Sequence, residues 1–458
     1  MNQLKTLSTF ALIMMTVVSV DSVRNLPASA LFGSQVIGYY LLAMLFFLIP
    51  CALASAYLSS KYPEGGIYVW VQQTLGKNWA LFAIWCQWIE NVIWFPTLLS
   101  FLIGSFFFTF FPHWTHHSGM LTIGIILLFG GMTWLNWYGV QFSAKLSVWC
   151  AWIGSLIPML LVIFLAGFWY LLGYPSQISI SLHDLVPTFS TQNMVSLAAI
   201  ALSFCGVELV AVHGSEIDQP EKKLPKALLI ASLVIGLTLL FGSLAIAVVL
   251  PAHKISLVAG LMQAFYAFFD AFGLTSILPL LMFMIFLGGM GSIVNWIIAP
   301  VKGLQLAAAD GYLPAIFSQQ NKNRVPTHLL SVQFTLVLLI AFIFQLSKTI
   351  NASYWILTVV AAQFYMMMYV LMFVACLKTP GAKNVKRSVS VLAKFLAIFG
   401  IIGSVFIFII SFIPPTDIVE TSKMAFILEI SCMLVGLTVP VLLLIFYRRY
   451  QRGHINHG

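Results

Sequence analysis

The chain has 458 residues, of which 61% are hydrophobic and only 8% are charged, and its mean hydropathy is +0.99. Soluble proteins carry about 25% charged residues, and a chain this apolar would expose too much apolar surface in water. The composition therefore excludes a soluble protein. The formal net charge of +9 comes from Lys and Arg residues scattered over separate segments, which does not indicate nucleic-acid binding.

Apolar stretches recur along the whole chain, and each is long enough to cross a ~30 Å hydrocarbon core as a helix of about 20 residues. They are continuously apolar, whereas strands of a membrane barrel alternate between apolar and polar residues. We predict an all-α membrane protein with twelve spans and one domain, 1–458. The predicted spans are 6–32, 36–59, 79–111, 120–138, 147–172, 193–213, 227–250, 274–300, 327–346, 354–377, 393–413 and 424–447.

The positive charges predict how this bundle is oriented. With the N-terminus in the cytoplasm, the inner segments hold 18 of the 22 Lys and Arg residues, whereas the outer loops hold Lys254, Lys348 and Lys423. Cytoplasmic loops of membrane proteins are enriched in Lys and Arg. We therefore predict a multi-pass protein of an inner (plasma) membrane with both termini in the cytoplasm. The six cysteines fall within predicted spans, so we expect no disulfide, metal site or cofactor.

The first span is interrupted by charged residues at mid-membrane. Asp21 and Arg24 lie there with Ser22, Asn25 and Pro27, and a charge at this depth costs about 2.5–3.5 kcal/mol. A broken helix that lines a cavity would explain them, because its freed backbone groups can bind a ligand. The alternative is that Asp21 and Arg24, at i and i+3, only neutralise each other.

The sixth span carries a second interruption. Gly206 permits backbone conformations that other residues resist, and Glu208 follows it within an apolar run. A carboxylate within a membrane is by default a functional residue, and a buried hydrogen-bonded Glu beside a tolerated Gly is the alternative. Broken helices at corresponding positions are typical of inverted-repeat transporters. We predict one repeat at 6–172, a second at 193–377 and two extra helices at 393–447.

Other polar and aromatic residues within spans are further candidates. Glu90 and Asn91 lie in the third span, and Ser292 and Trp296 lie in the eighth. In the tenth span, residues 365 and 369 are tyrosines four positions apart, which places them on one helix face. Lining of a pathway and packing within the bundle are both open for this pair.

Several short motifs resemble the amino acid–polyamine–organocation family. They are PEGGIY at 63–68, FCGVE at 204–208, EIDQP at 216–220 and WIIAP at 296–300. Within the family the chain most resembles the bacterial glutamate/γ-aminobutyrate antiporters, through segments 256–263, 321–326 and 412–415. It departs from them in three ways: the first break lacks glycines, Ser292 stands at an acidic position, and the long C-terminal plug is missing.

The resemblance implies a LeuT-type fold of 5+5 inverted repeats with helices 1 and 6 broken, working by alternating access. It also implies which residues contact the substrate and which act in gating or proton coupling. The substrate-binding positions are Asp21, Ser22, Val23, Arg24, Asn91, Phe204, Cys205, Gly206, Ser292, Trp296, Tyr365 and Tyr369. The gating or coupling positions are Glu208 and Glu90.

These observations predict a secondary active transporter that exchanges amino acids, with protons as a second candidate partner. The main alternative is a proton-coupled importer. A membrane-embedded enzyme and a channel are alternatives from other classes. Against the enzyme, the loops carry no paired carboxylates, metal-ligand cluster or nucleophile with a base. Against the channel, no ring of charges or carbonyl filter motif is visible. The substrate and the oligomeric state stay open at this stage.

Overall fold

The structure is a computed structural model that describes residues 8–62, 66–138, 149–150, 152–179, 186–187, 196–210, 217, 219–381, 387–415 and 422–455. Every regular element within these ranges is a helix, which confirms the predicted all-α fold. Part of the motif at 63–68 falls outside them, as do Glu216, Lys145, Lys383 and Lys386.

Ten stretches of helix within the described ranges are long and apolar enough to cross a membrane. They coincide with ten of the twelve predicted spans. They are built from α3 (Val36–Ala43), η3 (Met44–Leu48) and α4 (Ile49–Lys61) as one stretch, α6 (Lys77–Phe110), α7 (Ser118–Asn136), η5 (Trp152–Leu156) with α9 (Ile157–Leu171), α12 (Pro220–Val249), η8 (Thr275–Ile277) with α14 (Leu278–Ala309), α15 (Thr327–Ala341) with α16 (Ile343–Leu346), α17 (Ile350–Lys378), α18 (Arg387–Ile410) and α19 (Lys423–Ile455).

The first span is broken where the charges lie. Helix α1 (Thr9–Val20) stops at Asp21, whose backbone is extended, and the chain resumes as η1 (Val23–Asn25) and α2 (Leu26–Ala30). The two parts meet at an angle of 41°. Pro27 sits in the first turn of α2, where its missing N–H costs no hydrogen bond. The predicted interruption is therefore present in the structure.

The sixth span is also broken. Helix α11 (Ser196–Ser203) ends in a turn over 204–206, and a short 3-10 turn follows at 207–210. Gly206 has φ of 102°, a value that a residue with a side chain adopts only with strain. The described apolar segment, Leu197–Val210, is shorter than the other spans.

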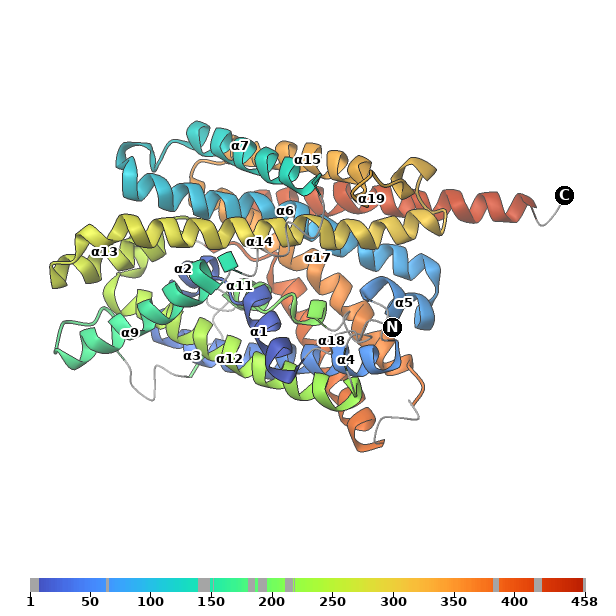
Figure 1. Cartoon of the computed structure of the whole chain (residues 1–458), viewed down its shortest axis with the longest axis horizontal. Helices are drawn as coiled ribbons and strands as arrows, with labels where there is room; N and C mark the ends of the chain where they lie inside the picture. The colour runs from blue at the N-terminus through green and yellow to red at the C-terminus, as the bar shows by residue number, and fades with distance from the viewer. Residues whose placement is uncertain are drawn as a thin grey trace.

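The helices follow the same order in the two parts of the chain that precede α18. In each part a broken helix is followed by a long helix, then by a short helix, and then by another long helix. This last helix is α6, with 34 residues, in the first part and α14, with 32 residues, in the second. The short helices are α5 (Ile67–Leu75) and α13 (Gly260–Phe272). Figure 1 shows them at opposite ends of the bundle, with the end of α19 on the side of α5.

The helices differ in how deeply they lie in the bundle. Within the spanning stretches of α6, α12 and α17, 78% of the residues are buried, whereas the value for α19 is only 11%. Helices α6 and α17 pack against each other, and α6 also packs against α14. Because α6, α14 and α17 surround the two breaks, side chains from these three helices can reach the same central space.

Candidate transport site

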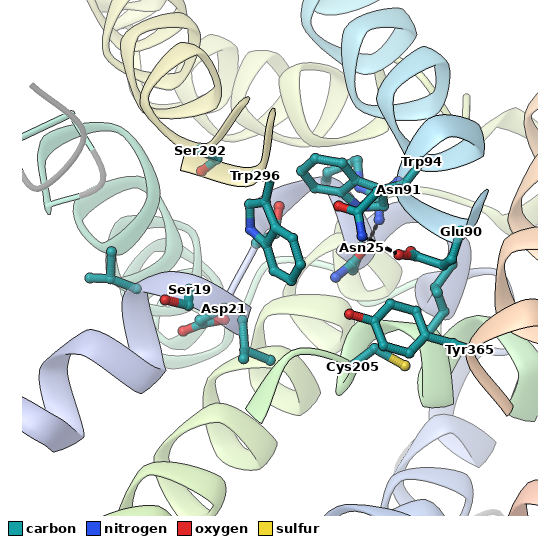
Figure 2. Close-up of a pocket in the computed structure, with 15 residues that line it drawn as sticks. Ser19, Asp21, Asn25, Glu90, Asn91, Trp94, Cys205, Ser292, Trp296 and Tyr365 are labelled. Atoms are coloured by element: carbon teal, nitrogen blue, oxygen red, sulfur yellow. Dashed lines mark hydrogen bonds between the residues drawn. The ribbon is translucent and has the colours of Figure 1, made fainter. Parts of the chain in front are cut away.

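A cavity lies at the two helix breaks. Its empty space is about 490 Å³, including the part that opens beyond the protein. Figure 2 shows side chains from α1, α6, α14 and α17 converging on it. The residues that line it are Val18, Ser19, Val20, Asp21, Ser22, Arg24, Asn25, Glu90, Asn91, Trp94, Leu202, Cys205, Ser292, Trp296 and Tyr365.

Arg24 is the buried cation of this cavity, with only 2% of its surface exposed. Its guanidinium donates to Thr97 Oγ1 and to Asn25 Oδ1, the latter at 2.9 Å, and its Cζ lies 5.3 Å from the centroid of Trp94. All of these partners are neutral, and Arg24 Nε has no hydrogen-bond partner. The guanidinium therefore retains a donor and a positive charge that no anionic side chain among the described residues contacts.

Asp21 does not form an ion pair with Arg24. Among the described residues, the ion pair within 4.0 Å joins Lys77 and Asp310 instead. Asp21 is 5% exposed and accepts a hydrogen bond of 2.8 Å from Thr238 on α12, while its Oδ1 atom has no partner. The alternative of a directly neutralising pair is thus not seen, and the two charges are buried separately.

Two further carboxylates come from α6 and from the turn after α11. Glu90 is 3% exposed, lines the cavity and accepts a hydrogen bond of 2.9 Å from Asn91 Nδ2. Glu208 is 1% exposed and lies behind the cavity wall. Both carboxylates are therefore buried within one small region of the bundle.

Glu208 holds the sixth-helix break together. Its Oε2 atom accepts hydrogen bonds from the Tyr369 hydroxyl and, at 3.2 Å, from the N–H of Gly206. Gln87 Nε2 donates to its other oxygen at 3.4 Å. Because the turn at Gly206 frees backbone groups, the Glu208 carboxylate and the Tyr369 hydroxyl supply the partners that a continuous helix would have provided.

Trp296 stands in the middle of the site. Its ring lies 5.8 Å from that of Trp94 on α6 and close against Gly206, where an added Cβ would be 3.1 Å from it. In Figure 2, Asp21 lies on one side of this ring, while Asn25 and Glu90 lie on the other. The indole therefore stands between Asp21 and the carboxylate of Glu90.

The cavity brings together most of the residues that the sequence singled out. Those that line it are Asp21, Ser22, Arg24, Glu90, Asn91, Cys205, Ser292, Trp296 and Tyr365. The others are buried beside it without lining it, namely Val23, Phe204, Gly206, Glu208 and Tyr369. Whether these residues contact a substrate stays a prediction.

Sequence reasoning missed three residues that contact Arg24. They are Asn25, Trp94 and Thr97. Trp94 and Thr97 follow Glu90 by four and seven positions, so all three lie on one face of α6. The helical spacing from Glu90 could have identified both. Asn25 could have been identified from its place beside Arg24.

Comparison with known proteins gives matches along nearly the whole chain. Residues 4–438 match the amino acid permease family. An uncharacterised transporter of Legionella pneumophila is 37% identical over 440 residues, which cover 94% of each chain. A glutamate/γ-aminobutyrate antiporter of Lactococcus lactis is 30% identical over 470 residues, covering 99% of this chain and 92% of that one.

A more distant match is a probable agmatine/putrescine antiporter of Lactococcus lactis, 24% identical over 304 residues, which cover 65% of this chain and 63% of that one. These relatives are transporters, which sets aside the alternative of a membrane-embedded enzyme. The family match spans both helix breaks and every residue that lines the cavity. The chain therefore belongs to the amino acid permease family and is a multi-pass inner-membrane transporter.

Proposed function

We propose that the protein is an amino acid antiporter that works by alternating access and binds the substrate carboxylate at Arg24. The observation that carries the proposal is the free donor on a guanidinium that is 2% exposed and has only neutral partners. A buried cation whose direct partners are all neutral is poorly compensated. The planar guanidinium can bind a carboxylate through two parallel hydrogen bonds.

The charge of Arg24 also favours one substrate class over another. Glutamate and γ-aminobutyrate, named for the relative at 30% identity, both carry a carboxylate. Agmatine and putrescine, named for the relative at 24% identity, carry none and would place a positive charge beside Arg24. We therefore propose that the substrates carry a carboxylate, and that diamines are rejected by repulsion between like charges.

Alternating access follows from the proposed repeats at 6–172 and 193–377, with 393–447 as additions. The matching order of helices and the opposite positions of α5 and α13 in Figure 1 support an inverted relation between the two repeats. Transporters of this kind bind substrate between the repeats, near the broken helices, and expose that site to each side in turn. The cavity at the two breaks has the position that this mechanism requires.

Counterflow in proteoliposomes tests the substrate and the transport mode. Vesicles loaded with one unlabelled compound are assayed for uptake of a labelled one, using the twenty amino acids, their decarboxylation products, agmatine and putrescine. We expect exchange of compounds with a carboxylate and none of the diamines. Uptake into empty vesicles under a proton gradient, without stimulation by internal substrate, would instead support the importer.

Substitution of Arg24 tests the carboxylate site. Arg24→Lys should raise the KM for exchange because the ammonium lacks the guanidinium fork, and Arg24→Ala should raise it further. Arg324→Lys, in an exposed loop, is the matched control and should behave as wild type. Recovery of expression and exchange in the Asp21→Ala, Arg24→Ala double variant would mean that the two residues only neutralise each other, and would refute the proposal.

A further inference from the structure

Glu90 is the carboxylate that the charge of Arg24 influences most directly. The positive charge of Arg24 acts electrostatically on Glu90, although the two groups form no ion pair within 4.0 Å. Both line the same cavity. Burial disfavours the ionised form of Glu90, and the charge of Arg24 opposes this effect. Arg24 is therefore the cation that offsets Glu90 wherever Glu90 is ionised.

Without the charge of Arg24, the other titratable groups around Glu90 would make its ionised form unfavourable. Glu208 is close enough for repulsion between the two carboxylates. From the neighbouring elements, Cys205 and Tyr365 also face Glu90 and interact with it electrostatically. Both are neutral in their ordinary protonation states. Ionised Glu90 thus depends on one guanidinium while a second carboxylate repels it, a balance that a third carboxylate from a ligand would upset.

Glu90 is better placed than Glu208 to change its protonation state. Glu208 accepts hydrogen bonds from Tyr369, Gly206 and Gln87, so its ionised form is held by three donors. Glu90 accepts a bond from Asn91 and lies on the cavity wall, where water can deliver a proton. The ligand site and the exchangeable carboxylate are therefore in contact with the same space.

We propose that Glu90 and the ligand carboxylate compete for the charge of Arg24, so that Glu90 takes up one proton when ligand binds. This inference rests on the proposed carboxylate site at Arg24. Before binding, Arg24 offsets ionised Glu90. After binding, Arg24 offsets the ligand carboxylate and Glu90 carries a proton taken from water in the cavity. The charge of the Arg24–Glu90 pair plus the ligand carboxylate is zero in the bound state, so binding leaves no net buried charge on these three groups.

The coupling has a consequence for exchange between unlike substrates. When both exchanged substrates engage Arg24, each is carried with a proton on Glu90, and the two proton movements cancel. Net proton movement then arises only from any difference in the charges of the two substrates themselves. Glu90 therefore makes binding sensitive to pH without fixing the proton stoichiometry of the overall exchange.

Calorimetry on the purified full-length protein in detergent tests the proton uptake. Binding of L-glutamate, and of the amino acid exchanged fastest in counterflow, is measured at each of several pH values in buffers of different ionisation enthalpy. At each pH, the slope of the observed binding enthalpy against the buffer's ionisation enthalpy gives the number of protons taken up per ligand. Wild type should take up a proton over a window of pH, and its Kd should rise by up to about tenfold per pH unit where Glu90 is ionised. In Glu90→Gln, uptake should vanish and the Kd should no longer depend on pH.

Glu208→Gln is the matched variant, an identical change at the other buried carboxylate, and it should retain the proton uptake. Binding without proton uptake in wild type would overturn the inference while leaving the proposed function intact. Because this measurement uses the wild-type protein, it does not depend on whether any variant folds. Loss of uptake in Glu208→Gln alone would assign the proton to Glu208 instead. Absence of any amino acid binding in wild type would count against the proposed function itself.

Discussion

Gly206 keeps the sixth-helix break in a conformation that depends on the absence of a side chain. Its φ is 102°, and an added Cβ would lie 3.1 Å from the Trp296 ring. Left-handed backbone costs other residues roughly 1–2 kcal/mol, and the contact would also displace Trp296 from the cavity. We expect Gly206→Ala to be inserted in the membrane but to lose most of its counterflow activity.

A glycine outside the site separates strain from displacement of Trp296. Gly273, at the end of α13, also has a positive φ of 68°, but nothing lies within 4 Å of an added Cβ. Gly273→Ala carries comparable backbone strain and should retain transport. If both variants lose activity equally, backbone strain alone accounts for the effect and the contact with Trp296 is unimportant.

Two stacked tyrosines on α17 should differ in their contribution to stability. The Tyr369 hydroxyl donates to Glu208 and accepts from the N–H of Gly206, whereas the Tyr365 hydroxyl has no hydrogen-bond partner within 3.5 Å among the described residues. Removing a hydrogen bond to a buried charged group costs roughly 1.5–3 kcal/mol. Tyr369→Phe should therefore lower the melting temperature in detergent, and Tyr365→Phe should leave it nearly unchanged. Equal melting temperatures would contradict the hydrogen-bonded role of Tyr369.

At the scale of residues, the sequence could identify the charges of the site but not their partners. Asp21, Arg24, Glu90 and Glu208 stand out because charges in apolar spans are costly. Their contacts depend on how distant helices pack. Thr238, which donates to Asp21, is 217 positions away along the chain. No pattern within one helix could show that Asp21 contacts α12 rather than Arg24.

At the scale of elements, α5 is tied to the end of α14 by one carboxylate. Asp310 accepts hydrogen bonds from Tyr68 at 2.6 Å and Gln72 at 2.8 Å on α5, and it pairs with Lys77 at 3.0 Å. Burial alone would raise the pKa of the Asp310 carboxyl, but these three partners outweigh burial and hold its pKa below the usual value. The interaction therefore stabilises the ionised form.

The lowered pKa of Asp310 sets the pH range over which α5 stays attached. A carboxyl whose pKa is lower in the folded state stabilises it above its ordinary pKa, and this stabilisation is lost as pH falls through the folded value. We expect hydrogen exchange of α5 amides to stay slow from neutral pH down to the ordinary pKa of Asp, about 3.9, and to speed up only on further acidification. Faster exchange already at pH 6 would contradict this.

Substitution of the same carboxylate should release α5 at neutral pH. In Asp310→Asn the ion pair with Lys77 is lost and the bonds from Tyr68 and Gln72 are weakened, so exchange of α5 amides should speed up. Asp270→Asn, at an exposed position on α13, is the control and should leave α5 unchanged. Unaltered exchange in Asp310→Asn would show that apolar packing holds α5 in place.

The sequence predicted the spanning elements well because each is a long apolar run, but apolarity does not mark where a helix ends. The eighth span was expected to end at 300, whereas α14 continues through Pro300 to Ala309. The last span was expected to end at 447, whereas α19 continues to Ile455. Helices extend beyond the apolar layer because polar residues such as Arg and Gln are also good helix formers.

At the scale of the whole molecule, the sequence placed the two helix breaks at corresponding positions, in the first and sixth spans, but it could not demonstrate an inverted repeat. Interruptions in the first and sixth spans suggested two halves, yet the halves have no self-similarity that is visible by eye. The short helices α5 and α13 were not predicted, because each has 13 residues or fewer and lies outside the spans. An inverted pair of repeats would place them at opposite ends of the bundle, as they are in Figure 1.

The orientation of the bundle gives the last prediction. Figure 1 places α9 and α13 toward one end, and α5 and the C-terminal part of α19 toward the other. Lys77 and Arg448 lie at this second end. They belong to the segments that the sequence predicts to be cytoplasmic, which together hold 18 of the 22 Lys and Arg residues. Since Lys and Arg remain on the cytoplasmic side during insertion, we propose that this end is cytoplasmic and that both termini lie there.

Reporter fusions test this orientation directly. A fusion after Lys226 should report the cytoplasm, and so should one after Lys145, which falls outside the described residues. A fusion at Ser176, in the exposed segment that follows α9, should report the periplasm. A periplasmic signal after Lys226 together with a cytoplasmic signal at Ser176 would mean that the bundle has the opposite orientation.

Periplasmic signals after both Lys226 and Ser176 would instead mean that the broken sixth segment, Leu197–Val210, does not cross the membrane. The number of spans would then be odd, the termini would lie on opposite sides, and an inverted pair of five-helix repeats could not form.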